Sequence, residues 1–226
     1  MNVLEAYDEW SHTYDDDRNL TRDLDEEVMR RTFTGAKYEA ILEIGCGTGK
    51  NTALLTEIAN RVEAIDFSEA MIERARRRSS ARNLKLIVAN LTEPWPVSDS
   101  AINLISCNLV LEHIENLSFI FAEATRVLTP AGHFFVCELH PFRQYRGTKA
   151  SFQRNAQAHI IDAFVHDVTD FIEAARNHNL GLETIKEWRH DEDRDKPPRL
   201  ISFLFKKGVR SPTVREGSPG INEPVD

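Results

Sequence analysis

The pattern of apolar and polar positions predicts a domain in which strands and helices alternate along the chain. Short apolar runs indicate buried strands, and segments with apolar residues at helical spacing follow them. The expected strands cover residues 41–44, 62–66, 84–89, 101–107, 133–139, 182–188 and 200–206. The expected helices cover residues 3–14, 21–33, 51–59, 69–78, 117–128 and 168–178. Such alternation is typical of a parallel sheet with right-handed crossovers.

Three segments depart from this rhythm. Residues 1–35 are polar and aromatic and predict a helical lid before the first strand. Residues 140–163 are basic and aromatic and contain two histidines, and we expect them to form a substrate cap at the carboxyl edge of the sheet. The charged connection 189–198 suits a hairpin, so the last strand should run antiparallel. We therefore expect a single domain over residues 1–207 and a mobile tail over residues 208–226.

The first strand runs directly into a glycine-rich turn. Gly45, Gly47 and Gly49 alternate after apolar residues 41–44, and a helical pattern follows at once. Glycine lets the backbone turn tightly and lets a ligand approach the main chain, and free amides at a helix start favour anions. The turn therefore predicts a nucleotide pocket. Lys50 stands where a dinucleotide fingerprint needs its third glycine, and Ile44 and Asn51 do not fit a phosphate-binding P-loop.

An acidic residue ends the second expected strand. Asp66 falls 19 residues after Gly47. A carboxylate at this place can accept hydrogen bonds from both ribose hydroxyls of an adenosine.

The motif Glu43-x-Gly45-x-Gly47-x-Gly49 resembles motif I of the class I S-adenosylmethionine (SAM) methyltransferases. Residues 108–114 are similar to the segment that follows the fourth strand of that family, and 126–136 (RVLTPAGHFFV) are similar to its R-V-L-K-P-G-G element, with Ala131 in place of a glycine. The resemblance implies a Rossmann-like α/β fold with a seven-stranded, mostly parallel sheet, an antiparallel last strand and helices on both faces. It also implies that SAM is the cofactor.

The resemblance also carries a set of expected cofactor-binding residues. Tyr14 would lie over the cofactor, although it could equally dock the helices on the sheet. The Asn90 carbonyl oxygen would contact the adenine amino group, and Asn108 would lie beside the methionine part. The whole set is Tyr14, Glu43, Gly45, Cys46, Gly47, Gly49, Asp66, Phe67, Asn90, Leu91, Asn108 and Leu109.

Histidines near the cofactor edge are the candidates for acid–base chemistry, because histidine titrates in the range of a general base. His140 follows the fifth strand and His166 precedes a helix start, so these two are the expected catalytic residues. The expected substrate-binding residues are His113, Tyr145, Arg146 and His159.

Composition narrows the choice of partners. The formal net charge of −8 argues against a nucleic-acid backbone as partner. The three cysteines are far apart and lie in or beside apolar runs, so we expect buried thiols and no bound metal. No apolar run is long enough for a membrane span, and the start of the chain lacks the order of a signal peptide, which predicts a cytoplasmic protein.

These observations predict methyl transfer from SAM to an oxygen or nitrogen of a small molecule, with S-adenosylhomocysteine (SAH) as product, by a monomer or homodimer. A methyltransferase acting on tRNA or protein is one alternative. A nicotinamide-binding oxidoreductase and a SAM-binding protein without catalysis are two others.

Overall fold

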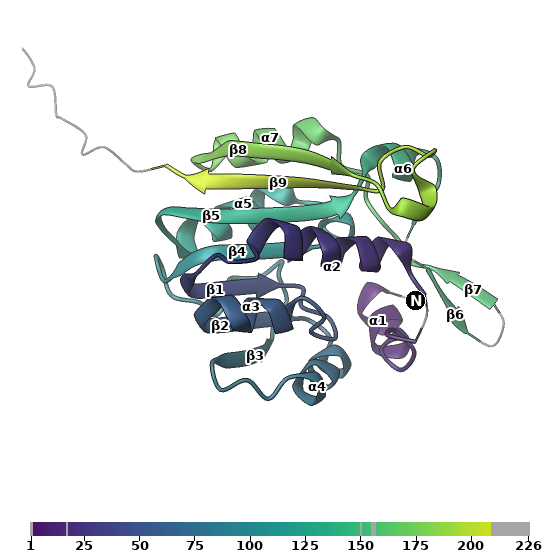
Figure 1. Cartoon of the computed structure of the whole chain (residues 1–226), viewed down its shortest axis with the longest axis horizontal. Coiled ribbons are helices and arrows are strands. Elements are labelled where there is room, and N and C mark those ends of the chain that lie inside the picture. Colours follow the sequence, from purple (N-terminus) through teal and green to yellow (C-terminus); the bar gives the residue numbers. More distant parts are fainter. Residues whose placement is uncertain (1, 17, 150, 155–156, 209–226) are drawn as a thin grey trace, which may run out of the picture.

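The computed structural model describes residues 2–16, 18–149, 151–154 and 157–208, so the expected tail 208–226 lies outside it except for Gly208. Its main sheet has seven strands in the order β3-β2-β1-β4-β5-β9-β8 (Figure 1). The strands are β1 (Tyr38–Ile44), β2 (Ala59–Asp66), β3 (Leu84–Val88), β4 (Ile102–Asn108), β5 (Leu128–Leu139), β8 (Leu180–Trp188) and β9 (Leu200–Lys207). The helices are α1 (Val3–Trp10), α2 (Leu20–Phe33), α3 (Thr52–Ile58), α4 (Glu69–Arg78), α5 (Leu117–Val127), α6 (Pro141–Tyr145) and α7 (Val168–Asn177), with short 3₁₀ turns η1 (Leu111–His113) and η2 (Asp191–Asp193).

The strand directions confirm the predicted fold class. Strands β3, β2, β1, β4 and β5 pair in parallel, whereas β9 runs antiparallel to both β5 and β8. The chain leaves β1 toward β2 on one side and returns to β4 on the other. This reversal opens a crevice at the carboxyl ends of β1 and β4, which is where open α/β sheets bind ligands.

Helices cover both faces of the sheet (Figure 1). On one face, Val28 of α2 and Leu55 of α3 pack against Phe135 of β5 in one apolar cluster. On the other face, Phe121 of α5 packs edge-on against Phe134 of β5 at 5.2 Å between ring centroids. Both layers exclude water from the middle of the sheet, so its strand ends are held rigidly.

Two element boundaries differ from the sequence prediction by four or more residues. Helix α1 ends at Trp10, where the Ser11 hydroxyl donates to the Asp8 carbonyl at 2.7 Å, a local bond that competes with helix continuation. Strand β5 starts at Leu128, five residues before the predicted start. Leu128 pairs with Ile102 through a register shift, and Ala131 has a φ of 61°, so a bulge carries the strand through the predicted break.

The segment after β5 forms α6 and a separate hairpin of β6 (Ser151–Arg154) and β7 (Gln157–Ile160). Its return arm reaches the N-terminal helix, because Ile161 packs on Ala6 and Trp10. This places the predicted cap beside α1 at one end of the sheet (Figure 1). Across the described residues, no helix combines the length and apolar character needed to span a membrane.

Candidate functional site

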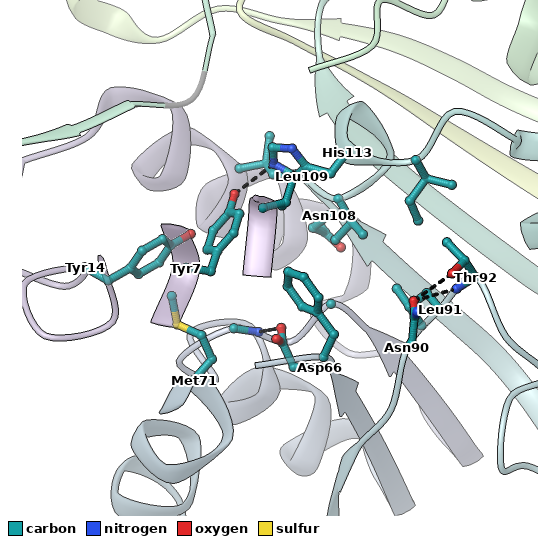
Figure 2. A pocket seen from close by; sticks show the side chains of 16 residues that line it. Tyr7, Tyr14, Asp66, Met71, Asn90, Leu91, Thr92, Asn108, Leu109 and His113 are labelled. Carbon is teal, nitrogen blue, oxygen red and sulfur yellow. Dashed lines mark hydrogen bonds between the residues drawn. The ribbon is translucent and has the colours of Figure 1, made fainter. Parts of the chain in front are cut away.

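A cavity of about 140 Å³ opens at the carboxyl ends of β1, β2 and β4 (Figure 2). The strand ends and the turns after them supply its floor, and Val3, Tyr7 and Tyr14 of the N-terminal segment close it. Its lining residues are Val3, Tyr7, Tyr14, Gly45, Gly47, Asp66, Phe67, Met71, Asn90, Leu91, Thr92, Asn108, Leu109, Val110, His113 and Ile114. Most of the expected cofactor residues therefore meet in one cavity.

Two glycines of the turn serve different purposes. Gly45 has a φ of +71°, and a Cβ on it would lie 2.1 Å from Val110 Cγ2, so a side chain there collides with the loop after β4. Gly47 has a φ of +51°, and a Cβ on it would meet nothing within 4 Å. The absence of a side chain at Gly47 keeps the backbone open to the cavity, as a close-lying ligand requires.

Asp66 ties the glycine turn to the end of β2. Its Oδ2 accepts from the Gly47 amide at 2.8 Å, and its Oδ1 accepts from the Ser68 amide at 2.9 Å. Burial raises the pKa of Asp66 to about 6, against the opposing effect of these amides. A buried carboxylate therefore lies where the predicted ribose would bind.

Asn90 has a local role that the sequence prediction did not include. Its carbonyl oxygen accepts from the Thr92 amide at 3.0 Å and from the Thr92 hydroxyl at 2.9 Å. Because an amide oxygen has two lone pairs, these bonds already fill the acceptor that was expected to face the adenine amino group. Asn90 and Leu91 still line the cavity.

A smaller cavity of about 60 Å³ adjoins the first, with Gly45, Gly47 and Asn108 among its shared walls. Its charged lining residues are the acids Asp25 and Glu43 and the bases Arg22 and Lys50. Asp25 accepts from the side-chain amides of Asn108 at 2.6 Å and Asn51 at 2.7 Å. Glu43 accepts from the Thr52 hydroxyl at 2.5 Å, and burial raises its pKa to about 8. Burial also raises the pKa of Asp25. These carboxyl groups are costly to ionise alone and would be stabilised by a cationic ligand.

A hydrogen-bonded pair, Tyr7 and His113, forms another wall of the first cavity (Figure 2). The Tyr7 hydroxyl lies 2.9 Å from His113 Nε2, and His113 Nδ1 lies 3.2 Å from the Asp162 carbonyl oxygen. Since a carbonyl only accepts, Nδ1 carries the hydrogen, and Nε2 accepts from Tyr7. Burial lowers the pKa of His113, which favours the neutral form of the ring.

Residues 42–136, which span the glycine turn, Asp66 and the loop after β4, match the family described as "Methyltransferase domain". Residues 42–136 therefore carry a methyltransferase domain, which supports the resemblance to the class I SAM-dependent methyltransferases. It is 26% identical over 246 residues to the uncharacterized methyltransferase AN0656 of Emericella nidulans, covering 85% of this chain and 82% of that protein. It is 29% identical over 206 residues to a malonyl-[acyl-carrier protein] O-methyltransferase of Legionella pneumophila, covering 87% of this chain and 71% of that protein.

The fold of this methyltransferase is shared with solved structures. A SAM-dependent methyltransferase from Mesorhizobium loti superposes with a TM-score of 0.70 at 16% identity, covering 84% of this chain and all of that chain. Among further curated relatives, the chain spans about half the length of several O-methyltransferases.

The two histidines that we expected to be catalytic do not line the cavities of this methyltransferase. His140 caps α6, with Nδ1 accepting from the Phe142 amide at 3.2 Å and Nε2 lying 3.1 Å from Glu187 Oε1. His166 donates from Nε2 to the carbonyls of Leu111 and Ile114 at 3.2 and 2.8 Å. In both residues, these imidazole nitrogens hold loops in place.

The structure also separates the other expected substrate residues. His113 lies in the cavity wall, whereas Tyr145 and Arg146 are exposed at the end of α6 and do not line it. His159 belongs to β7, and its side chain is outside what the structure describes. The chain turns away after β5 because Arg143 is buried against Asp193 and the Pro197 and Pro198 carbonyls, which draws α6 toward η2.

Site residues that the sequence prediction missed come from segments remote from the glycine turn. Asp25 lies on α2. The sequence feature that could have indicated it is an acidic residue on the helix face that carries the buried Leu24 and Val28. Glu138 is the penultimate residue of β5 and accepts from the amides of Val110 and Leu111 at 3.0 and 2.9 Å, which holds the loop after β4 in place. Burial raises the pKa of Glu138 to about 8.

Proposed function

We propose that this methyltransferase transfers a methyl group from SAM to an oxygen or nitrogen of a small-molecule acceptor. The observation that carries the proposal is that Gly47 lines both the cavity at Asp66 and the adjoining smaller cavity, which holds Asp25 and Glu43. When bound, SAM supplies an electrophilic methyl group on a positively charged sulfur.

The residues present fit the two ends of such a cofactor. At the nucleoside end, Asp66 would accept from the ribose hydroxyls, and Phe67 and Leu91 offer apolar surface for a base. At the amino-acid end, Asp25 and Glu43 suit an ammonium group. Lys50 lines the same cavity and pairs with Asp23 and Glu26. The raised pKa values of Asp25 and Glu43 support this assignment, because a bound cation would favour the ionised carboxylates.

On the acceptor side, Tyr7 and His113 provide a route for a proton. The Tyr7 oxygen can take the proton of an acceptor hydroxyl or ammonium while its own proton passes to His113 Nε2. The Asp162 carbonyl, bonded to Nδ1, would stabilise the imidazolium that results. The aromatic rings of Tyr7 and Phe67, whose centroids lie 6.2 Å apart, form part of the cavity wall beside this pair. The O-methyltransferase relative from Legionella pneumophila supports oxygen as the acceptor atom.

Calorimetric titration with SAH, and with NADH in parallel, tests the cofactor assignment. We expect micromolar SAH binding, its sharp weakening in Asp66→Ala, and no comparable NADH binding. Absence of SAH binding would overturn the proposal.

The acceptor class is tested with methyl-labelled SAM and a cell extract divided by ultrafiltration. Label that accumulates in the low-molecular-weight fraction supports a small acceptor. Label that stays with protein or RNA would contradict it.

A further inference from the structure

The N-terminal segment that closes the cofactor cavity (residues 2–16) has a small apolar anchor. Its buried apolar side chains are Ala6 and Trp10, which pack on Ile161. This cluster is separate from the two larger clusters that fill the faces of the sheet. Local stability is low where few apolar contacts are buried, so polar contacts contribute a large share of what keeps this segment closed.

Asp15 joins the end of this segment to two parts of the domain. Its Oδ1 accepts from the Thr48 hydroxyl at 2.9 Å, and its Oδ2 lies 2.9 Å from Arg78 Nη2 and 3.8 Å from Arg74 Nε. The Asp15 side chain is 23% exposed, and partial burial makes its ion pairs stronger than pairs in open solvent. One carboxylate therefore ties the segment both to the glycine turn and to the end of α4.

Asp8 makes a second polar contact from α1, which lies beside α4 (Figure 1). Its Oδ1 accepts from the Ser68 hydroxyl at 2.5 Å. Ser68 is fully buried, and its amide donates to Asp66 Oδ1 at 2.9 Å. Asp8 therefore meets the same residue that holds the proposed ribose-binding acid in place.

Both contacts end on the segments that form the proposed cofactor site. Thr48 follows Gly47 in the glycine turn, and Ser68 lies two residues after Asp66. The amides of Gly47 and Ser68 donate to the two oxygens of Asp66, so the turn and the end of β2 form one bonded unit. A ligand that orders this unit also orders the partners of Asp8 and Asp15, which couples closure of the segment to binding.

We propose that Asp8 and Asp15 latch residues 2–16 over the cofactor cavity and thereby act as positioning residues for the cofactor. The partners that complete this latch are Ser68, Thr48 and Arg78. When the latch opens, the cofactor enters; when it closes, Tyr7 and Tyr14 return to the cavity wall. This inference rests on the proposed function for the identity of the cofactor.

Hydrogen exchange followed by mass spectrometry tests the latch in the ligand-free protein. Asp15→Asn keeps the size of the side chain and removes its ion pairs, whereas Asp16→Asn removes the same charge from the adjacent exposed residue. We expect the α1 amides of Asp15→Asn to exchange about five- to tenfold faster than in wild type, with β1 and β4 unchanged and Asp16→Asn like wild type. Unchanged exchange in α1 would overturn the proposal. An equal rise in β1 and β4 would also overturn it, because Asp15 would then support the whole fold.

A double-mutant cycle locates the ion pair. Arg78→Gln should speed α1 exchange, whereas Arg77→Gln, at the exposed neighbouring position, should not. Because Asp15→Asn and Arg78→Gln remove the same pair, the double variant should exchange little faster than Asp15→Asn alone. Fully additive effects would overturn the latch as assigned.

SAH titrations test the link between the latch and the cofactor. We expect SAH to slow α1 exchange in wild type, and Asp15→Asn and Asp8→Ala to raise the dissociation constant for SAH about three- to tenfold, with Asp16→Asn unchanged. Wild-type SAH affinity in an Asp15→Asn protein with faster α1 exchange would overturn the positioning role. If the wild type did not bind SAH, the proposed function would fail, whereas exchange in the ligand-free protein would still decide whether the latch exists.

Discussion

Replacing Asp66 by asparagine tests the central contact of the proposed cofactor site. The substitution would keep the size of the side chain but would remove its charge and one of its acceptor oxygens. In the wild type, both carboxylate oxygens already hold the backbone, one at the Gly47 amide and one at the Ser68 amide. An amide nitrogen placed against the Gly47 N–H would also repel it, so the substitution disturbs the turn as well as the ribose contact.

The expected loss can be derived from these contacts. Losing one hydrogen bond from a ribose hydroxyl to a buried carboxylate costs about 1.5–2 kcal/mol, and replacing the other by a bond to a neutral amide oxygen costs about 1 kcal/mol more. Since every 1.4 kcal/mol is a factor of ten, the dissociation constant for SAH should rise roughly 100-fold. The pKa of Asp66 is about 6, so titrations at pH 8 keep the wild-type carboxylate ionised.

Calorimetry with SAH measures this loss, and thermal unfolding shows whether the variant is folded. Glu63→Gln is the matched control, because Glu63 is a buried acid on the same strand that pairs with Arg61 and Lys85 away from the cavity. The control should bind SAH within about twofold of wild type, as expected for a change outside the site. A folded Asp66→Asn protein that bound SAH as tightly as the control would refute the ribose assignment.

Three further predictions follow from the same geometry. Gly45→Ala should lower the free energy of unfolding by more than about 2 kcal/mol, because the new Cβ would collide with Val110 and the backbone has a positive φ. The control Gly147→Ala, at φ +88° with open space around it, should lower it by about 1 kcal/mol. Denaturant unfolding measures both. Folding raises the pKa of Glu138 from 4.5 to about 8, so between these values the folded state keeps a proton that the unfolded chain releases. The free energy of unfolding should therefore fall as the pH rises from 5 to 8. In thermal unfolding across that range, Glu138→Gln should show a weaker pH dependence. SAM binding at pH 7 should release protons as Glu43 ionises beside the cation, and Glu43→Gln should release fewer in calorimetry repeated in buffers of different ionisation enthalpy.

Local spacing was enough to predict the framework of the protein. Residues 41–44 form the buried end of β1, the turn follows with its three glycines at positive φ, and Ser68 caps α4 by accepting from the Met71 amide at 3.1 Å. Asp66 ends β2 as predicted. These features depend on residues close in sequence, where hydrophobic period, backbone freedom and capping act directly.

Spacing along the chain did not predict which histidine lines the cavity. His113, His140 and His166 all lie toward the carboxyl side of the sheet, yet only His113 of these three lines the cavity. Strand and helix order places a backbone at an edge, but the direction of each side chain follows from its partners. For His140 and His166, those partners are Glu187 and the carbonyls of Leu111 and Ile114, which lie 47 to 55 positions away in the sequence.

The sequence by itself determined the alternation of elements, the glycine turn and the acid at the end of β2. Only the tertiary structure decided that Arg22 and Asp25 of α2 face the cavities and that Tyr7 meets His113 across 106 residues. The physical reason is that a periodic pattern encodes which face of an element is buried. The neighbour that this face will meet is set by the packing of segments far apart in the chain.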